Sequence, residues 1–329
     1  MGRWVLSTDL LARSRFTVSP FTETVAALMI LTQPVPPGTP WIGSFRALHR
    51  EACLGMLAEN ELRAVVEEHM WRPRRGQRMG WIADFLGLPP LGNGATFADE
   101  LGQLAAWDDE RIRDEIRQHA LGPLPAALGR PGLRDAVADM LRWTWTATLA
   151  SDWPRRRRVL EADILTRTSS LARHGWAGVL DTLAPYFSWL GEGRLQINGY
   201  ELPERDLSQA RELDFVPVHS YGGWDMLELP HRYALVYPVS GALADTGSTR
   251  ADTDGLGRLI GPNRARVLRL LEQPRSTTQL AALTGLPPGA VGNHLRVLLQ
   301  AGTVLRRRAG RDVLYWRTSL GDALAAPGR

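Results

Sequence analysis

The amino-acid sequence predicts a mainly α-helical protein with small β elements, an α+β fold. Three observations carry this prediction. Before about residue 190, apolar residues recur at helical spacing between Pro- and Gly-rich breaks. Short β-branched and aromatic runs follow, and the C-terminal region returns to helical spacing before it ends in two strand-like runs. A chain of 329 residues is long enough for two domains of about 150 residues each.

The first clear helix begins at Ser19-Pro20, because Ser can cap a helix and Pro fits its first turn. An apolar run continues to Leu31, and QPVPPGTP at 33–40 ends it. Three more helices are expected where apolar residues recur every three or four positions: Phe97–Gln118, Leu133–Ala150 and Arg155–His174.

A small sheet is expected at about 194–240, after these helices. Its strands are the runs Arg194–Tyr200, Leu213–Ser220 and Tyr233–Val239, each bounded by Gly, Pro or Asp. The polar, Gly-rich stretch that follows contains the predicted linker, 251–261. The sequence therefore divides into an N-terminal domain (1–250), this linker and a C-terminal domain (262–329).

The charge is distributed unevenly between these domains. All 39 basic residues are arginine, which excludes a P-loop lysine, a Schiff-base lysine and a Ser-Lys hydrolase pair. From residue 262 onward, eleven arginines face three acidic residues, a formal charge of +8. The preceding residues carry 28 arginines and 32 acidic residues, a formal charge of −4. A basic module on an acidic body is typical of nucleic-acid binders.

The C-terminal pattern is specific. After a helix over Asn263–Gln273, Ser276 and Gln279 form a capping box that opens the helix Thr277–Thr284. Gly285 supplies a left-handed turn, and a third helix follows over Pro288–Gln300. This is the helix-turn-helix pattern. Two alternating runs, TVLRRR and RDVLYWRT, then flank Ala-Gly and predict a β-hairpin, so the module reads as a winged helix.

The segment from RARVLRLLEQPRSTTQL to DVLYWRTSLGDAL resembles the ArsR-type winged-helix repressors over its whole length. DLLARSRFTVSPFTETVAAL, WPRRRRVLEADILTR, LDFVPVHS and ALVYPVSG resemble actinobacterial regulators that join this module to a long N-terminal domain of unknown function. The resemblance implies a cytoplasmic, dimeric, sequence-specific transcriptional regulator, most simply a repressor. It would bind double-stranded DNA at a pseudo-palindromic operator.

The expected DNA contacts lie on the two helices of the helix-turn-helix and on the hairpin. Asn can pair with adenine and Arg with guanine, so base contacts are expected from Asn293 and Arg296. His294 is equally suited to packing, to phosphate or to a base. The hairpin arginines would contact phosphates or enter a minor groove. The full set is Thr278, Pro288, Ala290, Gly292, Asn293, His294, Arg296, Arg306, Arg308 and Arg311.

Two features depart from the family pattern. Pro287 stands where a Ser or Thr usually caps the reading helix, and Gly292 lies in the stretch that should read bases. Gly292 either lets this helix approach the DNA backbone closely, or it is a sequence change without a function that the helix tolerates because its packing in the protein stabilises it.

Metal sensing is not expected, although ArsR-type proteins often perform it. Those sensors carry Cys pairs on the helix that corresponds to Thr277–Thr284, or Asp and His sets on a terminal helix. Here that helix reads TTQLAALT, Cys53 is the single cysteine, and the seven His form no close pair with ligand spacing. We therefore expect no metal and no cofactor. One cysteine also fits a reducing cytoplasm.

Neither catalysis nor membrane insertion is expected. The sequence lacks G-x-S-x-G and H-E-x-x-H, and an enzyme is the weakest reading. The longest apolar run, Val25–Leu31, is far shorter than the roughly 20 residues of a membrane helix. The N-terminus shows no secretory signal pattern.

Two features of the N-terminal domain stay open. Trp143, Trp145 and Trp153 either belong to a core or line a pocket for a flat organic effector. The run PRRRR at 154–158 either contacts phosphate or begins a helix whose arginines pair with Asp152 and Glu161, and we favour the helix.

Two functional hypotheses follow. The first is a regulator that a small organic effector releases from DNA. The second is a regulator or architectural DNA binder without such a ligand, whose N-terminal domain serves only dimerisation or protein contact.

Overall fold

The structure is a computed structural model that describes residues 2–34, 40–60, 62, 66, 71–73, 80–119, 125–199, 202–239, 255–272, 274–309 and 312–325. These residues form two compact units. The N-terminal unit comprises Met1–Trp153 and Ser170–Ser240, and the C-terminal unit comprises Pro154–Ser169 and Gly241–Arg329. The sequence did not predict that Pro154–Ser169 would group with the C-terminal unit.

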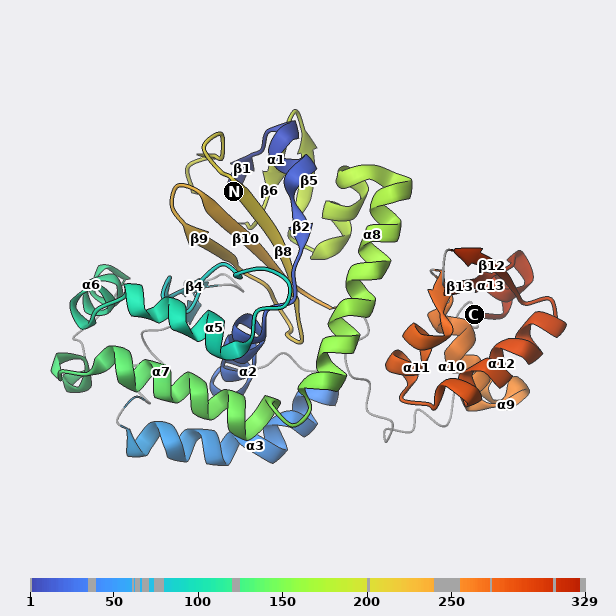
Figure 1. The fold of residues 1–329 in the computed structure, drawn as a ribbon, viewed down its shortest axis with the longest axis horizontal. Helices are drawn as coiled ribbons and strands as arrows, with labels where there is room; N and C mark the ends of the chain where they lie inside the picture. Colours follow the sequence, from blue (N-terminus) through green and yellow to red (C-terminus); the bar gives the residue numbers. More distant parts are fainter. Residues whose placement is uncertain are drawn as a thin grey trace. The chain divides into compact units, whose positions relative to one another are not determined.

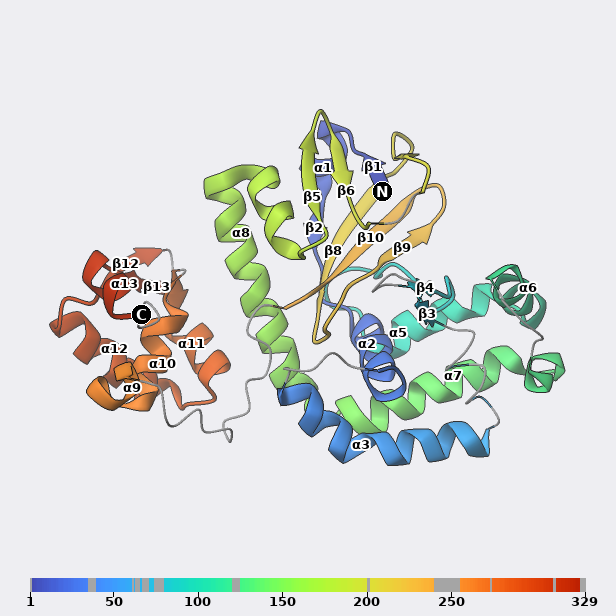
Figure 2. The same cartoon turned by 180° about the vertical axis from the view of Figure 1, so that it is seen from behind.

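The N-terminal unit gathers most of its helices at one end and its two four-stranded sheets at the other (Figures 1 and 2). Ser19 caps α2 as predicted, because its Oγ accepts a hydrogen bond from the Thr22 N–H at 3.0 Å. The α-helices are α1 (Thr8–Arg13), α2 (Pro20–Thr32), α3 (Pro40–Glu59), α5 (Phe97–Leu101), α6 (Asp109–His119), α7 (Leu133–Thr144) and α8 (Trp153–Leu183).

The predicted single helix over Phe97–Gln118 is wrong. After α5 the chain makes a 3₁₀ turn over Gly102–Ala106, and α6 then starts afresh. The cause is Asp108, whose Oδ1 accepts a hydrogen bond from the Arg111 N–H at 2.8 Å and so caps a new helix. The predicted helix to Ala150 likewise ends as α7 at Thr144, and a π turn continues over Trp145–Leu149.

The N-terminal unit holds two four-stranded sheets where the sequence predicted one small sheet. Their strand orders are β5-β6-β1-β7 and β2-β8-β10-β9. The three predicted strands are present as β6, β8 and β10. The strands are β1 (Arg3–Val5), β2 (Arg15–Phe16), β5 (Ser188–Gly191), β6 (Arg194–Gln196), β7 (Arg205–Asp206), β8 (Glu212–Val218), β9 (Asp225–Glu228) and β10 (Arg232–Pro238), and β3 (Trp71–Pro73) pairs separately with β4 (Gly80–Ile82).

The prediction that the first 190 residues are helical is therefore also wrong at β1 to β5. Trp4 pairs with Leu195, and Phe16 pairs with Phe215. β1 and β2 have only two or three residues, too few to show an alternation in the sequence, and their partners lie almost 200 residues away. By contrast, β8 and β10 run parallel and almost fully buried, which is why they read as continuous apolar runs.

The C-terminal unit contains the predicted order of helix, helix-turn-helix and hairpin. Its elements beyond α8 are α9 (Gly255–Ile260), α10 (Pro262–Leu270), β11 (Arg275–Ser276), α11 (Thr277–Thr284), α12 (Pro288–Gln300), β12 (Val304–Ala309), β13 (Asp312–Arg317) and α13 (Ser319–Ala325). The strands form one sheet in the order β11-β13-β12.

The predicted linker at 251–261 is wrong for its second half, because Gly255–Ile260 forms α9. Leu256 and Ile260 of this helix pack against the core of the C-terminal unit. Two apolar residues four positions apart are enough to bury one face of a short helix when a core lies beside it. The first half of the predicted linker lies outside the described residues.

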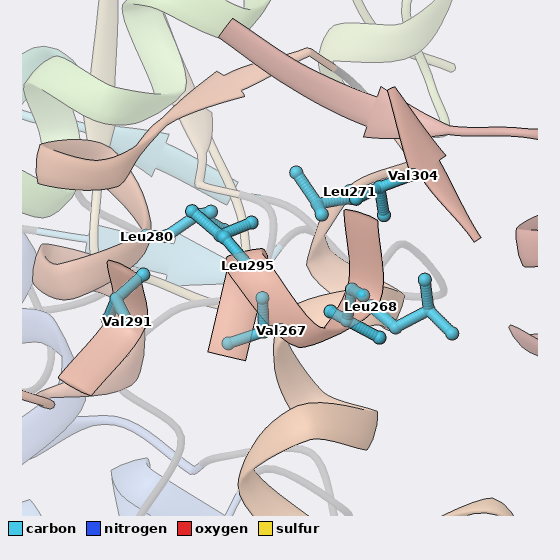
Figure 3. Packing of buried hydrophobic residues seen from close by; sticks show 8 residues of the cluster. Val267, Leu268, Leu271, Leu280, Val291, Leu295 and Val304 are labelled. Carbon is cyan, nitrogen blue, oxygen red and sulfur yellow. The ribbon is translucent and has the colours of Figure 1, made fainter. Parts of the chain in front are cut away.

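One apolar core holds the C-terminal unit together (Figure 3). It draws on α10, α11, α12 and β12, so each element of the helix-turn-helix contributes to it. Its fully buried members are Val267, Leu268, Leu271, Leu280, Val291, Leu295, Leu298 and Val304. Burial of such a side chain is worth about 1.5–3 kcal/mol. This core fixes α12 against α10 and α11.

None of the helices in the described part of the chain combines the length and the hydropathy that a bilayer crossing requires.

Candidate nucleic-acid interface

The turn between α11 and α12 is built as the sequence predicted. Ser276 Oγ accepts a hydrogen bond from the Gln279 N–H at 3.3 Å, and Gln279 Oε1 accepts one from the Ser276 N–H at 2.7 Å. At the other end, Gly285 lies at φ +72°, in the left-handed region that favours glycine. The capping box and the glycine thus set the length of α11 and the direction in which α12 leaves it.

Arginines of the C-terminal unit differ in whether they are available to DNA. Arg266 donates to the backbone oxygens of Thr284 (3.2 Å) and Leu283 (3.1 Å), so it ties α10 to the C-terminal end of α11. Arg275 Nε donates to the Leu270 oxygen at 2.8 Å. Burial lowers the pKa of both guanidinium groups. These arginines serve the fold, so the formal charge of +8 overstates the charge that faces DNA.

Helix α12 separates a core face from an outer face. Val291, Leu295 and Leu298 are buried in the core. Asn293 and Arg296 are exposed on the outer face, and Arg296 Nη2 donates a hydrogen bond to Asn293 Oδ1 at 2.7 Å. The structure therefore brings together the two residues from which base contacts were expected.

The other predicted contacts on the helix-turn-helix are at least partly accessible. Thr278, in the first turn of α11, and Pro288, at the start of α12, are exposed. Ala290, Gly292 and His294 are half-buried. Burial, and next the charge of Arg264, lowers the pKa of His294 below its usual 6.5. This shift favours the neutral imidazole in the free chain.

Arg264 is a residue that the sequence reasoning did not single out. It lies on α10, close enough to His294 to affect its pKa, and it is half-buried. The sequence did show that Arg264 lies in the first turn of a helix that precedes the helix-turn-helix. Because α10 and α12 share one core, an arginine in that turn could have been expected near α12.

The beginning of α12 shows the predicted departure from the family pattern. Pro287 is the N-cap residue and makes no side-chain capping bond. The helix still starts here, because the Ala290 and Val291 N–H groups donate to the Pro287 oxygen at 2.9 and 3.1 Å. A Cβ atom at Gly292 would meet nothing within 4 Å. Packing within the protein thus does not require glycine at this position.

The hairpin places its arginines on two faces. β12 pairs with β13 so that Arg306 lies opposite Tyr315, Arg307 opposite Leu314 and Arg308 opposite Val313. Side chains alternate along a strand, so Arg306 and Arg308 share the face of Val304, which points into the core beside α12. Arg307 lies on the opposite face. All three arginines are exposed, and Arg311 lies outside the described residues.

The three tryptophans of the proposed effector pocket do not form one group. The ring of Trp145 stacks on Phe97 with centroids 4.9 Å apart, and Trp153 meets Trp145 edge-on at 5.3 Å. Trp143 precedes Trp145 by two positions, and residues two apart do not share a helix face. One face of Trp145 is thus already covered by Phe97.

The remaining candidate residues have structural roles. Arg157 Nε donates to Glu161 Oε1 at 2.8 Å, one of the two pairings expected for the run PRRRR, and Arg156 is buried. Burial raises the pKa of the Cys53 thiol to about 12, and this cysteine is therefore a thiol at neutral pH. Within the described residues, no group of three His, Cys, Asp or Glu side chains is placed to hold a metal ion.

One protein family matches part of the C-terminal unit. Residues 259–307 match a family described as "Helix-turn-helix domain". The solved structure of a mutant of Lactococcus lactis ZitR is similar at 24% sequence identity, with a TM-score of 0.20. That match covers 24% of this chain and 54% of ZitR, so the chain spans about half the length of that structure. The comparison with curated proteins found no significant match.

The family match and the geometry of α11, Gly285 and α12 define residues 259–307 of the C-terminal unit as a helix-turn-helix domain. Domains of this class bind DNA in transcription regulation, and the match therefore supports that role for the C-terminal helix-turn-helix.

Proposed function

We propose that this protein is a sequence-specific transcriptional regulator that lays α12 in the major groove of double-stranded DNA. One observation carries the proposal: α12 buries one face in the core and exposes Asn293 and Arg296 on the other, while Arg306 and Arg308 extend from the hairpin beside it. A rigid helix with exposed donors reads base edges, and flanking arginines neutralise phosphates.

The proposal includes a homodimer that acts as a repressor. A single reading helix contacts only a few base pairs, whereas a two-fold dimer reads two half-sites about 34 Å apart along the duplex. The resemblance to ArsR-type repressors supports both the dimer and the repression. Sedimentation of the full chain, alone and with DNA, tests the dimer, and a two-to-one ratio of chain to operator is the expected result.

Footprinting on the DNA that flanks the protein's own gene tests the function itself. We expect a protected pseudo-palindrome with the wild-type chain and its loss with Arg296→Ala. Arg142→Ala is the matched control, because Arg142 pairs with Asp139 on the surface of the N-terminal unit. It removes the same charge and should leave the footprint intact. Wild-type protein that protects no sequence, at salt low enough for general DNA binding, would contradict the proposal.

For the N-terminal unit, we propose assembly as the role that has the better structural support. Phe97 stacks on Trp145 and Trp153 meets Trp145 edge-on, so these half-buried tryptophans already contact aromatic rings of the protein. These contacts favour the hypothesis without a small-molecule ligand. The rival hypothesis is an organic effector bound by these tryptophans. A thermal-shift screen with flat aromatic compounds separates the two. A shift that Trp153→Leu abolishes would favour the effector.

A further inference from the structure

We propose that Asn293 is a positioning residue for Arg296, and that the pair acts as one unit that selects guanine. This inference rests on the proposed function and names the base that the reading helix prefers. It starts from the 2.7 Å hydrogen bond that Arg296 Nη2 donates to Asn293 Oδ1 on the exposed face of α12.

The bond changes what the two side chains offer to a base. An Asn that reads adenine needs its Oδ1 to accept from the adenine N6 amino group while its Nδ2 donates to N7. Here the guanidinium occupies one of the two acceptor sites of that oxygen, and it fixes the amide in an orientation set by Arg296 rather than by a base. The pair therefore presents mainly N–H donors outward: the guanidinium edge of Arg296 and the amide Nδ2 of Asn293.

Guanine is the base whose major-groove edge fits this set of donors. It shows two acceptors, O6 and N7, whereas adenine adds an amino donor and cytosine presents one. The sequence of α12, PGAVGNHLRVLLQ, has no Asp or Glu that could accept a hydrogen bond from cytosine. The chemistry of this helix thus favours guanine at the contacted position.

The bond also restrains a flexible side chain. Arginine has many rotamers, and each contact that orders it costs entropy. Asn293 lies three residues before Arg296, where neighbouring side chains meet on one helix face. Holding the guanidinium before DNA arrives lowers the cost of its bidentate contact. Asn293 acts through Arg296, and its removal should reduce base preference more than general affinity.

Binding selection from a pool of randomised duplexes, followed by sequencing, tests this inference on the full chain. Wild-type protein should enrich guanine at one position of each half-site, by about 5- to 150-fold over other bases. Asn293→Ala should reduce that preference by about 2- to 12-fold, the range for one exposed hydrogen bond, and leave binding to random DNA nearly unchanged. Asn293→Gln keeps an uncharged amide acceptor for Arg296, so it should restore guanine preference relative to Asn293→Ala.

Three outcomes separate the possibilities. Enrichment of adenine at a position that depends on Asn293 would overturn the inference, because Asn293 would then read the base itself. An unchanged preference in Asn293→Ala would also overturn it. Wild-type protein that enriches no sequence would refute the proposed function instead. Arg307→Ala, on the outer face of the hairpin, is the control for simple loss of charge.

Discussion

Replacing both Arg306 and Arg308 by glutamine should weaken DNA binding in a salt-dependent way. The strand register puts these two arginines on the face of β12 that packs beside α12. If each contacts one phosphate, the double variant loses two contacts. The slope of log K against log salt should then become shallower by about 1.8, because each contact contributes about 0.9.

The same arithmetic gives the loss of affinity. If the two proteins bind equally at about 1 M salt, the double variant should bind about 60-fold more weakly at about 0.1 M salt. At about 0.3 M salt the difference should fall to about ninefold. Fluorescence anisotropy with a labelled duplex of fixed length measures both values. A thermal melt of each variant checks that the C-terminal unit stays folded.

The matched control is Arg307→Gln, which removes an exposed charge from the opposite face of the same strand. Its salt slope should change by much less than about 0.9, the value for one phosphate contact. A double variant with the wild-type slope would refute the assignment of this face to DNA. An equal or larger effect of Arg307→Gln would show that the outer face of the hairpin contacts DNA.

Three further predictions concern stability. Leu295→Ala should lower the free energy of unfolding of the C-terminal unit by about 2–5 kcal/mol in urea denaturation, since Leu295 is fully buried; a loss under about 1 kcal/mol would contradict this core. Ser276→Ala should cost about 1 kcal/mol by the same measurement and Thr278→Ala much less, and equal losses would contradict the capping box. Burial raises the pKa of Glu115 from 4.5 to about 8, so the folded chain holds this proton more tightly than the unfolded chain. That stabilisation is complete below about pH 4.5 and is lost as pH rises through about 8. The melting temperature of Glu115→Gln should therefore depend less on pH than that of the wild type. An unchanged pH profile would contradict the raised pKa of Glu115.

The C-terminal unit could be predicted from sequence because its signals are local. The capping box at Ser276, the left-handed Gly285 and the apolar spacing of α12 each lie within a few residues of the feature that they determine. The hairpin follows in the same way from alternation around a glycine. In this region the tertiary packing agrees with the local sequence preferences, and the predicted order of helix, helix-turn-helix and hairpin was confirmed.

The N-terminal unit was harder to predict because its sheets depend on distant partners. β1 and β2 become strands by pairing with β6 and β8, almost 200 residues further on. The break before α6 depends on one capping carboxylate, Asp108, inside an otherwise helical pattern. Such features depend on tertiary pairing and on single hydrogen bonds. The spacing of apolar residues over a window of sequence does not reveal either of them.

The candidate site was predicted in composition but not in detail. Sequence reasoning singled out Asn293 and Arg296, but not the hydrogen bond between them. The formal charge of +8 counted every arginine of the C-terminal domain alike. Arg266 and Arg275 instead donate to backbone oxygens inside the unit, because a long side chain can fold back onto a helix end. Charge counting gives the sign of a surface, and only packing shows which cations remain on it.

Hydrogen–deuterium exchange of the full chain, with and without duplex DNA, tests the central claim most directly. If α12 and the hairpin hold the DNA, exchange should slow in peptides from Pro288–Gln300 and Val304–Arg317, and stay unchanged in α6. Protection confined to the N-terminal unit, or to the arginine run at 154–158, would contradict the assignment of DNA binding to the winged helix.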